Sequence, residues 1–416
     1  MNTFQHRLYP WGVLILLVVT PLFGQTAVAV PSFSGTLETG WGWFYQSTDL
    51  AVTGPHFEGK LAGAIGSAES PSGQYSVAGR LSLDSAGATT FNLGEAWARG
   101  YLGPLDLSVG NQSVSWGVTD VFTPLDVVNP RDQSHPMDSL KLPVPLVRVA
   151  LTGAGWSLDS VLVPAFAKSV LPETRWQTSP AFSPPNGITV VGRTLVDHIP
   201  SLTWDNLAWG GRLGVSFDVF QGLDLGLTVY QGRNPLPRPK VSLVATATQG
   251  QKTAQTTFDY DRFTLGGMDF VLAAEGLVLR AEAAGRVWRG ADFANPASGD
   301  ASAQGVASVE FTLPVIGVKA LFEGVADWAN TSAWEGTTRA KAVAVLSAVS
   351  DSRWSWKAIG AWDLEGAGMA SPQVTYVIAD GLSATAILFA FFGDSSVSWG
   401  AWYENSVAEA TLKYAF

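Results

Sequence analysis

The chain has 416 residues, a formal net charge of −10 and no cysteine. Disulfides, zinc–thiolate sites, iron–sulfur clusters and cysteine nucleophiles are therefore excluded. Only 14% of the residues are charged while 47% are hydrophobic, whereas soluble domains carry about 25% charged residues. This composition indicates that part of the protein surface contacts an apolar environment rather than water.

The first 29 residues have the features of a secretory signal peptide. His6 and Arg7 form a short basic region, an apolar core follows, and residues 27–29 (Ala-Val-Ala) form a small-x-small cleavage site. A signal anchor is the alternative, but the apolar run is shorter than the roughly 20 residues of a spanning helix. Cleavage removes one of the 25 basic residues and no acid. A single domain of residues 30–416, with a net charge of −11, is then expected.

Polar and apolar residues alternate with period two along much of the remaining chain, and no later apolar run is long enough for a spanning helix. In 315–327, for example, one face carries Lys319, Glu323 and Asp327 and the other carries Ile316, Val318, Ala320 and Phe322. This pattern is typical of a wall with lipid on one side and a lumen on the other. The fold class predicted is therefore all-β, a transmembrane antiparallel β-barrel. A soluble β-sandwich or propeller is the alternative, but its strands are usually only about 5–6 residues long.

About eighteen strands are predicted, with sixteen as the alternative number. They are placed at 33–45, 56–67, 73–84, 90–102, 105–114, 143–151, 156–164, 208–220, 223–231, 258–273, 277–288, 303–313, 316–327, 339–349, 352–363, 371–379, 382–391 and 407–416. Tight connections alternate with longer ones, which include 115–142, 165–207, 232–257 and 289–302. Short turns and both termini are expected in the periplasm, and long loops outside.

The last predicted strand carries an apolar face that includes Tyr414 and ends on Phe416. This ending resembles the recognition strand of Gram-negative outer-membrane barrels, which is read by the barrel assembly machinery. The resemblance implies localisation in the outer membrane, the assembly machinery as a partner, and Tyr414 and Phe416 as the assembly signal.

The third long connection, 115–142, concentrates charge in a chain that has little of it. It begins with Trp116-Gly117 and continues to the run Asp-Val-Val-Asn-Pro-Arg-Asp at 126–132. These residues resemble a motif of a largely uncharacterised family of porin-like Gram-negative outer-membrane β-barrels. In that family a strand ends in Trp-Gly and a loop carries Asp-Val-(Ile/Val)-Asn-Pro-x-Asp. The resemblance implies a porin-like barrel and names no substrate.

The third loop of general porins folds inward and narrows the channel. By position, 115–142 is thus expected to form a pore constriction, with Asp120, Asp126, Arg131 and Asp132 at its narrowest zone. The alternative is a capped turn in which Arg131 and its two flanking aspartates only tie the loop together. Hydrogen-bonded charge pairs form in either case, and they are strong only where water is excluded.

No enzymatic activity is expected, because the chain has no phosphate loop, dinucleotide fingerprint or EF-hand and no histidine pair at metal-ligand spacing. The run Ser-Val-Ser-Trp-Gly occurs twice, at 113–117 and 396–400, but it lacks the first glycine of a nucleophile elbow. No cofactor and no metal are expected either.

The predicted function is a porin or channel for passive diffusion of small solutes across the outer membrane. Two alternatives stay open: a channel for hydrophobic compounds, suggested by the many tryptophans, and a closed structural or surface-binding barrel. The expected partners are small solutes, outer-membrane lipids and lipopolysaccharide, but no nucleic acid. A basic loop favours lipopolysaccharide phosphates, although it is equally compatible with a solvated Pro-rich loop: Arg233, Arg238, Lys240 and Lys252. The sequence specifies neither the solute nor the oligomeric state.

Overall fold

Eighteen antiparallel strands close into a barrel in the computed structural model, as predicted. The structure describes residues 31–66, 71–83, 87–135, 139–172, 174–177, 189–245, 251–288, 300–313, 317–331, 334–349, 353–397 and 399–416. The predicted signal peptide lies outside these residues. Among the described residues, no helix is long and apolar enough to cross a membrane.

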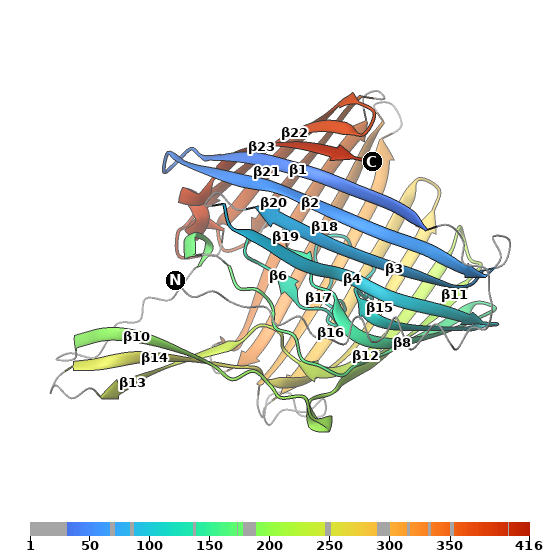
Figure 1. Ribbon diagram of the computed structural model, residues 1–416, viewed down its shortest axis with the longest axis horizontal. Helices are drawn as coiled ribbons and strands as arrows, with labels where there is room; N and C mark the ends of the chain where they lie inside the picture. Colours follow the sequence, from blue (N-terminus) through green and yellow to red (C-terminus); the bar gives the residue numbers. More distant parts are fainter. Residues whose placement is uncertain are drawn as a thin grey trace.

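The wall strands follow one another around the ring in chain order (Figure 1). The first nine are β1 (Ser32–Phe44), β2 (Asp49–Gly66), β3 (Pro71–Leu83), β4 (Thr89–Leu102), β5 (Leu105–Gln112), β8 (Val144–Gly153), β9 (Trp156–Val163), β11 (Ala208–Phe217) and β12 (Leu223–Arg233). The other nine are β15 (Arg262–Ala274), β16 (Leu277–Trp288), β17 (Asp300–Leu313), β18 (Val318–Thr331), β19 (Trp334–Val349), β20 (Trp354–Asp363), β21 (Ala367–Ala379), β22 (Leu382–Gly393) and β23 (Val407–Ala415).

The ring closes where β1 pairs with β23, from Thr36 opposite Ala415 to Phe44 opposite Val407. Gly35 and Phe416 extend this pairing, because each backbone N–H donates to the other residue's carbonyl at 3.0 Å. The Phe416 ring packs against Phe33, with ring centres 5.9 Å apart. Closure satisfies every strand edge of the wall, which a bilayer requires because lipid offers no hydrogen bonds.

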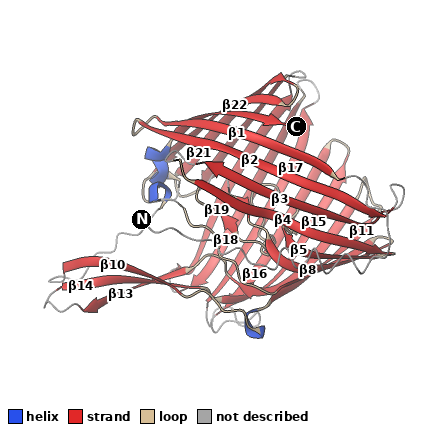
Figure 2. Ribbon diagram, viewed as in Figure 1, coloured by secondary structure: helices blue, strands red, loops and turns tan. Residues whose placement is uncertain are grey.

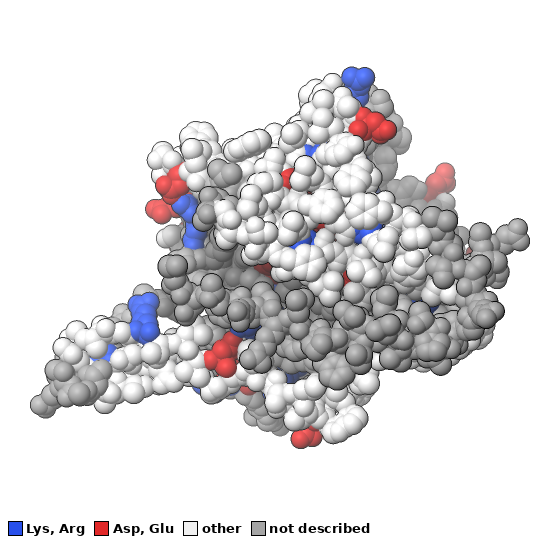
Figure 3. Space-filling model, in the orientation of Figure 1, with Lys and Arg blue, Asp and Glu red and all other residues white. Residues whose placement is uncertain are grey.

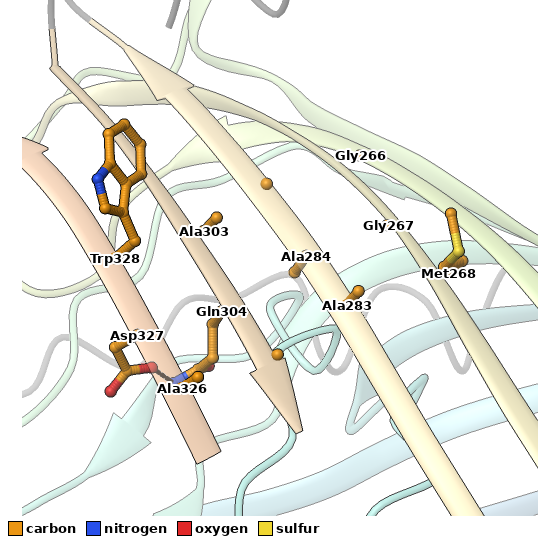
Figure 4. A pocket seen from close by; sticks show the side chains of 12 residues that line it. Gly266, Gly267, Met268, Ala283, Ala284, Ala303, Gln304, Ala326, Asp327 and Trp328 are labelled. Atoms are coloured by element: carbon orange, nitrogen blue, oxygen red, sulfur yellow. Dashed lines mark hydrogen bonds between the residues drawn. The ribbon is translucent and has the colours of Figure 1, made fainter. Parts of the chain in front are cut away.

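The alternation predicted from the sequence is the alternation of the wall. On β20, Trp354 and Trp362 are exposed on the outer face, while Asp363 is buried toward the lumen. On the adjacent strands β17 and β18, the side-chain amide of Gln304 donates a hydrogen bond to the Asp327 carboxylate at 2.5 Å (Figure 4). Charged side chains are sparse on the face of the wall shown in Figure 3 and gather toward its ends.

Two connections predicted as irregular loops, 165–207 and 232–257, contain strands outside the wall. Here β10 (Thr189–Asp197) pairs in parallel with β14 (Gln251–Asp259), and β13 (Arg238–Ala245) pairs with the other edge of β14. This three-stranded sheet projects away from one end of the barrel (Figures 1 and 2). The sheet was not predicted from the sequence, because prolines usually interrupt strands. Pro239 is tolerated because β13 is an edge strand, where a missing backbone N–H breaks no inter-strand hydrogen bond. The predicted wall strand at 258–273 begins only at Arg262, because residues 258 and 259 belong to β14.

The projecting sheet and the tight turns lie at opposite ends of the barrel, which gives a topology test in a chain without native cysteine. On intact cells, a membrane-impermeant maleimide is expected to label Ser242→Cys on β13. It is expected to reach Asp380→Cys, in the turn between β21 and β22, only after permeabilisation. Labelling of Asp380→Cys on intact cells would reverse the predicted orientation.

Deletion of Phe416 is expected to slow assembly, because it removes both closing hydrogen bonds with Gly35 and the packing on Phe33 and Phe57. The heat-modifiable, folded fraction in outer-membrane preparations measures the effect. Phe416→Tyr, which keeps the ring and the backbone bonds, serves as the matched control. An unchanged folded fraction in the deletion variant would remove the assembly role.

Candidate functional site: a loop held across the lumen

The connection between β5 and β8 leaves the wall and crosses the lumen. Residues 118–125 of this loop bind Glu282 on β16 and Glu323 on β18. These strands lie six and eight places around an eighteen-stranded ring from β5, so the contacts are on nearly the opposite wall. The loop therefore folds inward, as its third-loop position predicted.

Glu282 receives the first part of the crossing segment. One carboxylate oxygen accepts the backbone N–H groups of Val118 (2.5 Å) and Thr119 (2.7 Å) and lies 2.6 Å from the Thr119 hydroxyl. The other oxygen accepts the N–H of Leu125 at 3.2 Å. Charge-assisted bonds of this kind are roughly twice as strong as neutral ones. The buried carboxylate thus gathers both ends of the segment 118–125.

Glu323 receives the middle of the same segment. Its carboxylate accepts the N–H of Phe122 at 2.7 Å and those of Asp120 and Val121 at 3.2 and 3.3 Å. Like Glu282, it is almost fully shielded, with 2% of its surface exposed. Backbone amides outside regular secondary structure need acceptors when buried. We call Glu282 and Glu323 the glutamate clasp.

Two arginines of β16 add contacts on either side of the clasp. Arg280 bridges Asp120 of the loop and Glu310 of β17, each at 3.2 Å. Arg286 donates to the carbonyl of Pro124 at 2.8 Å. Consequently Arg280, Glu282 and Arg286, all on the lumen face of one strand, hold the loop.

Within the family-like motif, Asn129 joins the two ends of the loop. Its side-chain oxygen accepts the N–H of Val114 at 2.7 Å, and its amide donates to the carbonyls of Gln112 and Leu142, both at 3.0 Å. Only an amide side chain can both accept and donate in this way. The sequence marked Asn129 as a turn residue, but its capping of the end of β5 was not predicted.

The four predicted constriction residues lie in three different places of the loop. Asp126 is paired with Arg131 at 2.7 Å, as the motif suggested, and also with Lys141 at 2.8 Å. Asp120 lies apart from them, at Arg280, and Asp132 accepts the N–H of Ser134 at 2.9 Å. Asp126 and Arg131 therefore tie the loop together, and the constriction role of all four stays a prediction.

Apolar packing holds the loop down on one side of the lumen. Leu125 and Val128 of the loop are buried with Val114 and Trp116, and the Trp116 indole donates to Asp159 at 2.8 Å. Burial of each such aliphatic side chain contributes about 1.5–3 kcal/mol. The wall side of this cluster consists of Val144, Leu146, Val161, Val163, Ala208, Tyr230, Phe263, Leu265 and Ala284.

A second connection, from β9 to β11, reaches the other side of the barrel mouth. Its Trp176 is 3% exposed and packs with Phe44, Phe391 and Trp402. The Trp402 indole donates to the Trp176 carbonyl at 3.1 Å. Arg175 also pairs with Asp49 at the start of β2. The described parts of the two loops thus pack against the inside of the wall at two places near one end of the barrel.

Several other lumen charges form ion pairs between adjacent strands. Examples are Arg99–Asp106 (3.5 Å), Arg148–Asp159 (2.8 Å) and Lys319–Glu310 (2.8 Å). In the part of the chain that the structure describes, no group of three or more candidate ligands could hold a metal ion.

These features define the class of the protein by fold: a porin-like transmembrane β-barrel with an inward loop. Among solved structures, OccK9 of Pseudomonas aeruginosa is similar, with a TM-score of 0.50 and 11% identity over 93% of this chain and 97% of that chain. Salmonella typhi OmpF gives 0.46 and 10% over 94% and 100%, and a loop-deletion form of Vibrio cholerae OmpT gives 0.46 and 12% over 93% and 99%. No family model and no curated protein matches the chain. At these identities the likeness concerns the fold alone.

Removal of one glutamate of the clasp is expected to loosen the loop without opening the wall. Glu323→Ala leaves three backbone N–H groups without their acceptor, and bonds to charged groups contribute about 1.5–3 kcal/mol each. The variant should therefore unfold at a lower temperature and be cleaved faster by trypsin at Arg131. Glu38→Gln is the control, because the Glu38 carboxylate pairs with Lys413 of β23, 3.9 Å away, rather than with the loop. Equal cleavage of Glu323→Ala and the wild type would contradict the clasp.

Proposed function

We propose that this chain is an outer-membrane channel for passive diffusion of small solutes, with the loop at 113–143 as its constriction. The observation that carries the proposal is the glutamate clasp, which holds a charged loop across the lumen. Barrels of 16–18 strands enclose an aqueous channel unless a loop or a separate domain fills them. Loops that fill one end and are fixed in place narrow such a channel and select solutes by size and charge.

The other end of the lumen supports the same function. Lys319 and Lys413 point to the lumen face of their strands, near the tight turns, and about half of each side chain is exposed. Exposed ammonium groups inside a barrel require water around them. Water at this end and charged loops at the other are what a diffusion channel for polar solutes needs.

The proposal includes the location and the partners predicted from the sequence. Export by the segment 1–29, assembly through Tyr414 and Phe416, and an apolar outer wall all fit residence in an outer membrane. Of the predicted basic residues, Lys240 and Lys252 lie on β13 and β14 of the projecting sheet, where they are suited to lipopolysaccharide phosphates, although Lys240 is also paired with Asp259.

Two observations favour the other candidate functions. The lumen face of β19 to β22 is apolar near the mouth, which suits a channel for hydrophobic compounds: Val343, Val345, Ile359, Met369, Phe389 and Phe391. The projecting sheet exposes Leu195 and Val241, which suits a surface-binding barrel. Single-channel conductance separates these candidates, since a closed barrel conducts no ions.

Reconstituted in planar bilayers, the wild-type protein is expected to conduct ions, and deletion of residues 120–138 is expected to raise the conductance. Asp126→Asn leaves Arg131 and Lys141 without their shared carboxylate, so the field in the constriction becomes more positive. The reversal potential in a salt gradient should therefore shift toward anions.

Asp224→Asn, at the tight-turn end of β12, is the matched control for Asp126→Asn and should leave the reversal potential unchanged. Wild-type selectivity in Asp126→Asn together with wild-type conductance in the deletion variant would remove the constriction role. A wild-type protein that inserts but conducts nothing would instead support the closed barrel.

A further inference from the structure

A cavity of about 520 Å³ lies at the loop-bearing end of the barrel, beside the constriction loop. Its walls come from residues 126–133 of that loop, the Pro-rich segment 234–239 that precedes and begins β13, and the ends of β15, β16 and β17. This volume falls within the range of about 300–1,000 Å³ that small-molecule sites occupy. A solute that enters through this end therefore meets the cavity next to the constriction.

One side of the cavity is apolar. Phe263 of β15 belongs to the cluster beneath the loop, and Trp288, on the same face of β16 as Glu282 and Arg286, packs against that cluster. Leu236 and the neighbouring prolines also line the cavity. Rigid rings and prolines present apolar surface at little cost in side-chain entropy.

The charged groups of the cavity nearly cancel each other. Asp126 is paired with Arg131 and Lys141, and Arg238 is paired with Asp261 at 3.0 Å. The cations at the cavity are Arg131, Arg238 and Arg286, with Lys141 behind them, and the carboxylates are Asp126, Asp261 and Asp300. The three cations and three carboxylates among the described lining residues balance, and Lys141 behind them is itself paired with Asp126.

Arg286 is the lining cation that forms no close ion pair with a described carboxylate. Among the described residues its guanidinium makes one hydrogen bond, to the neutral carbonyl of Pro124. Asp327 on β18, which accepts a hydrogen bond from the Gln304 amide (Figure 4), attracts the charge of Arg286 only through space. A guanidinium has five N–H donors in a planar fork, so most of its capacity is available to a ligand.

We propose that this cavity binds a small organic monoanion, with its oxyanion group on Arg286 and its apolar body against Phe263 and Trp288. The inference deepens the proposed channel by naming a solute class, and it rests on that proposal for its physiological role. Binding itself depends only on the cavity.

The geometry disfavours other solutes. An organic cation would meet Arg286 while the carboxylates Asp126 and Asp261 are already paired. A neutral molecule of the same shape would offer the guanidinium only uncharged acceptors, whose hydrogen bonds are weaker than charge-assisted ones. An inorganic anion would leave the rings of Phe263 and Trp288 in contact with water.

Isothermal titration calorimetry on the folded protein in detergent tests the site independently of conductance. The probes are p-toluenesulfonate, its neutral analogue p-toluenesulfonamide and methanesulfonate. Saturable binding of p-toluenesulfonate with one site per chain is expected. The neutral analogue and the headgroup alone should each bind at least about tenfold more weakly, because each loses one class of contact.

Variants locate the site. Arg286→Gln is expected to weaken p-toluenesulfonate binding by about tenfold or more, and Arg286→Lys by less, because it keeps the charge without the fork. Trp288→Ala should weaken p-toluenesulfonate and leave methanesulfonate unaffected. Lys319→Gln, which removes a lumen cation near the tight turns, should bind as the wild type does. Trypsin cleavage at Arg131 shows whether the loop keeps its position in each variant.

Equal binding of the sulfonate and the sulfonamide would overturn the proposal, as would wild-type affinity in Arg286→Gln with the loop in place. Loss of binding in Lys319→Gln to the same extent as in Arg286→Gln would reduce the site to general attraction by lumen cations. The outcomes also separate the two proposals. Binding without conductance removes the channel and keeps the site, whereas conductance without binding removes the site and keeps the channel.

Discussion

Backbone amides of a loop inside a barrel have to find acceptors, and this requirement organises the lumen. The segment 118–125 has no strand or helix of its own, so its N–H groups turn to Glu282 and Glu323 on the facing wall. Each carboxylate in turn is buried with its charge satisfied by several donors, which makes the burial tolerable. Without the glutamates the amides of 118–125 would lose these acceptors, and without the loop the two buried carboxylates would lose the donors that satisfy them.

The wall follows from the sequence because its rules are local. Period-two alternation, tight turns and an apolar terminal strand each involve neighbouring residues, so both the strand number and the inward third loop were predictable. The clasp was not, because Glu282 lies more than 150 residues from the amides it accepts and looks in the sequence like any other lumen charge. The projecting sheet was missed for a related reason: β10 and β14 come from two different connections, and each alone resembles a polar loop with prolines nearby.

The loop is a fixed body rather than a swinging gate in this arrangement. Asn129 joins its two ends, Asp126 gathers Arg131 and Lys141, Leu125 is packed into the wall cluster, and the clasp holds the far side. Contacts of four different kinds at four different points leave no hinge within the described part of the loop.

The strand β16 links the position of the loop to the charge at the mouth. Glu282 and Arg286 are four residues apart on the same lumen face, and both contact the loop, one through amides and the other through the Pro124 carbonyl. The Glu282 carboxylate accepts hydrogen bonds from the loop with both of its oxygens. Arg286 donates one hydrogen bond to the loop, and its other N–H groups remain available. Exchange of the two side chains would leave a carboxylate facing a carbonyl and a guanidinium facing N–H groups. The order of charges along β16 is therefore fixed by the direction of the loop backbone, and a cation at the cavity follows from it.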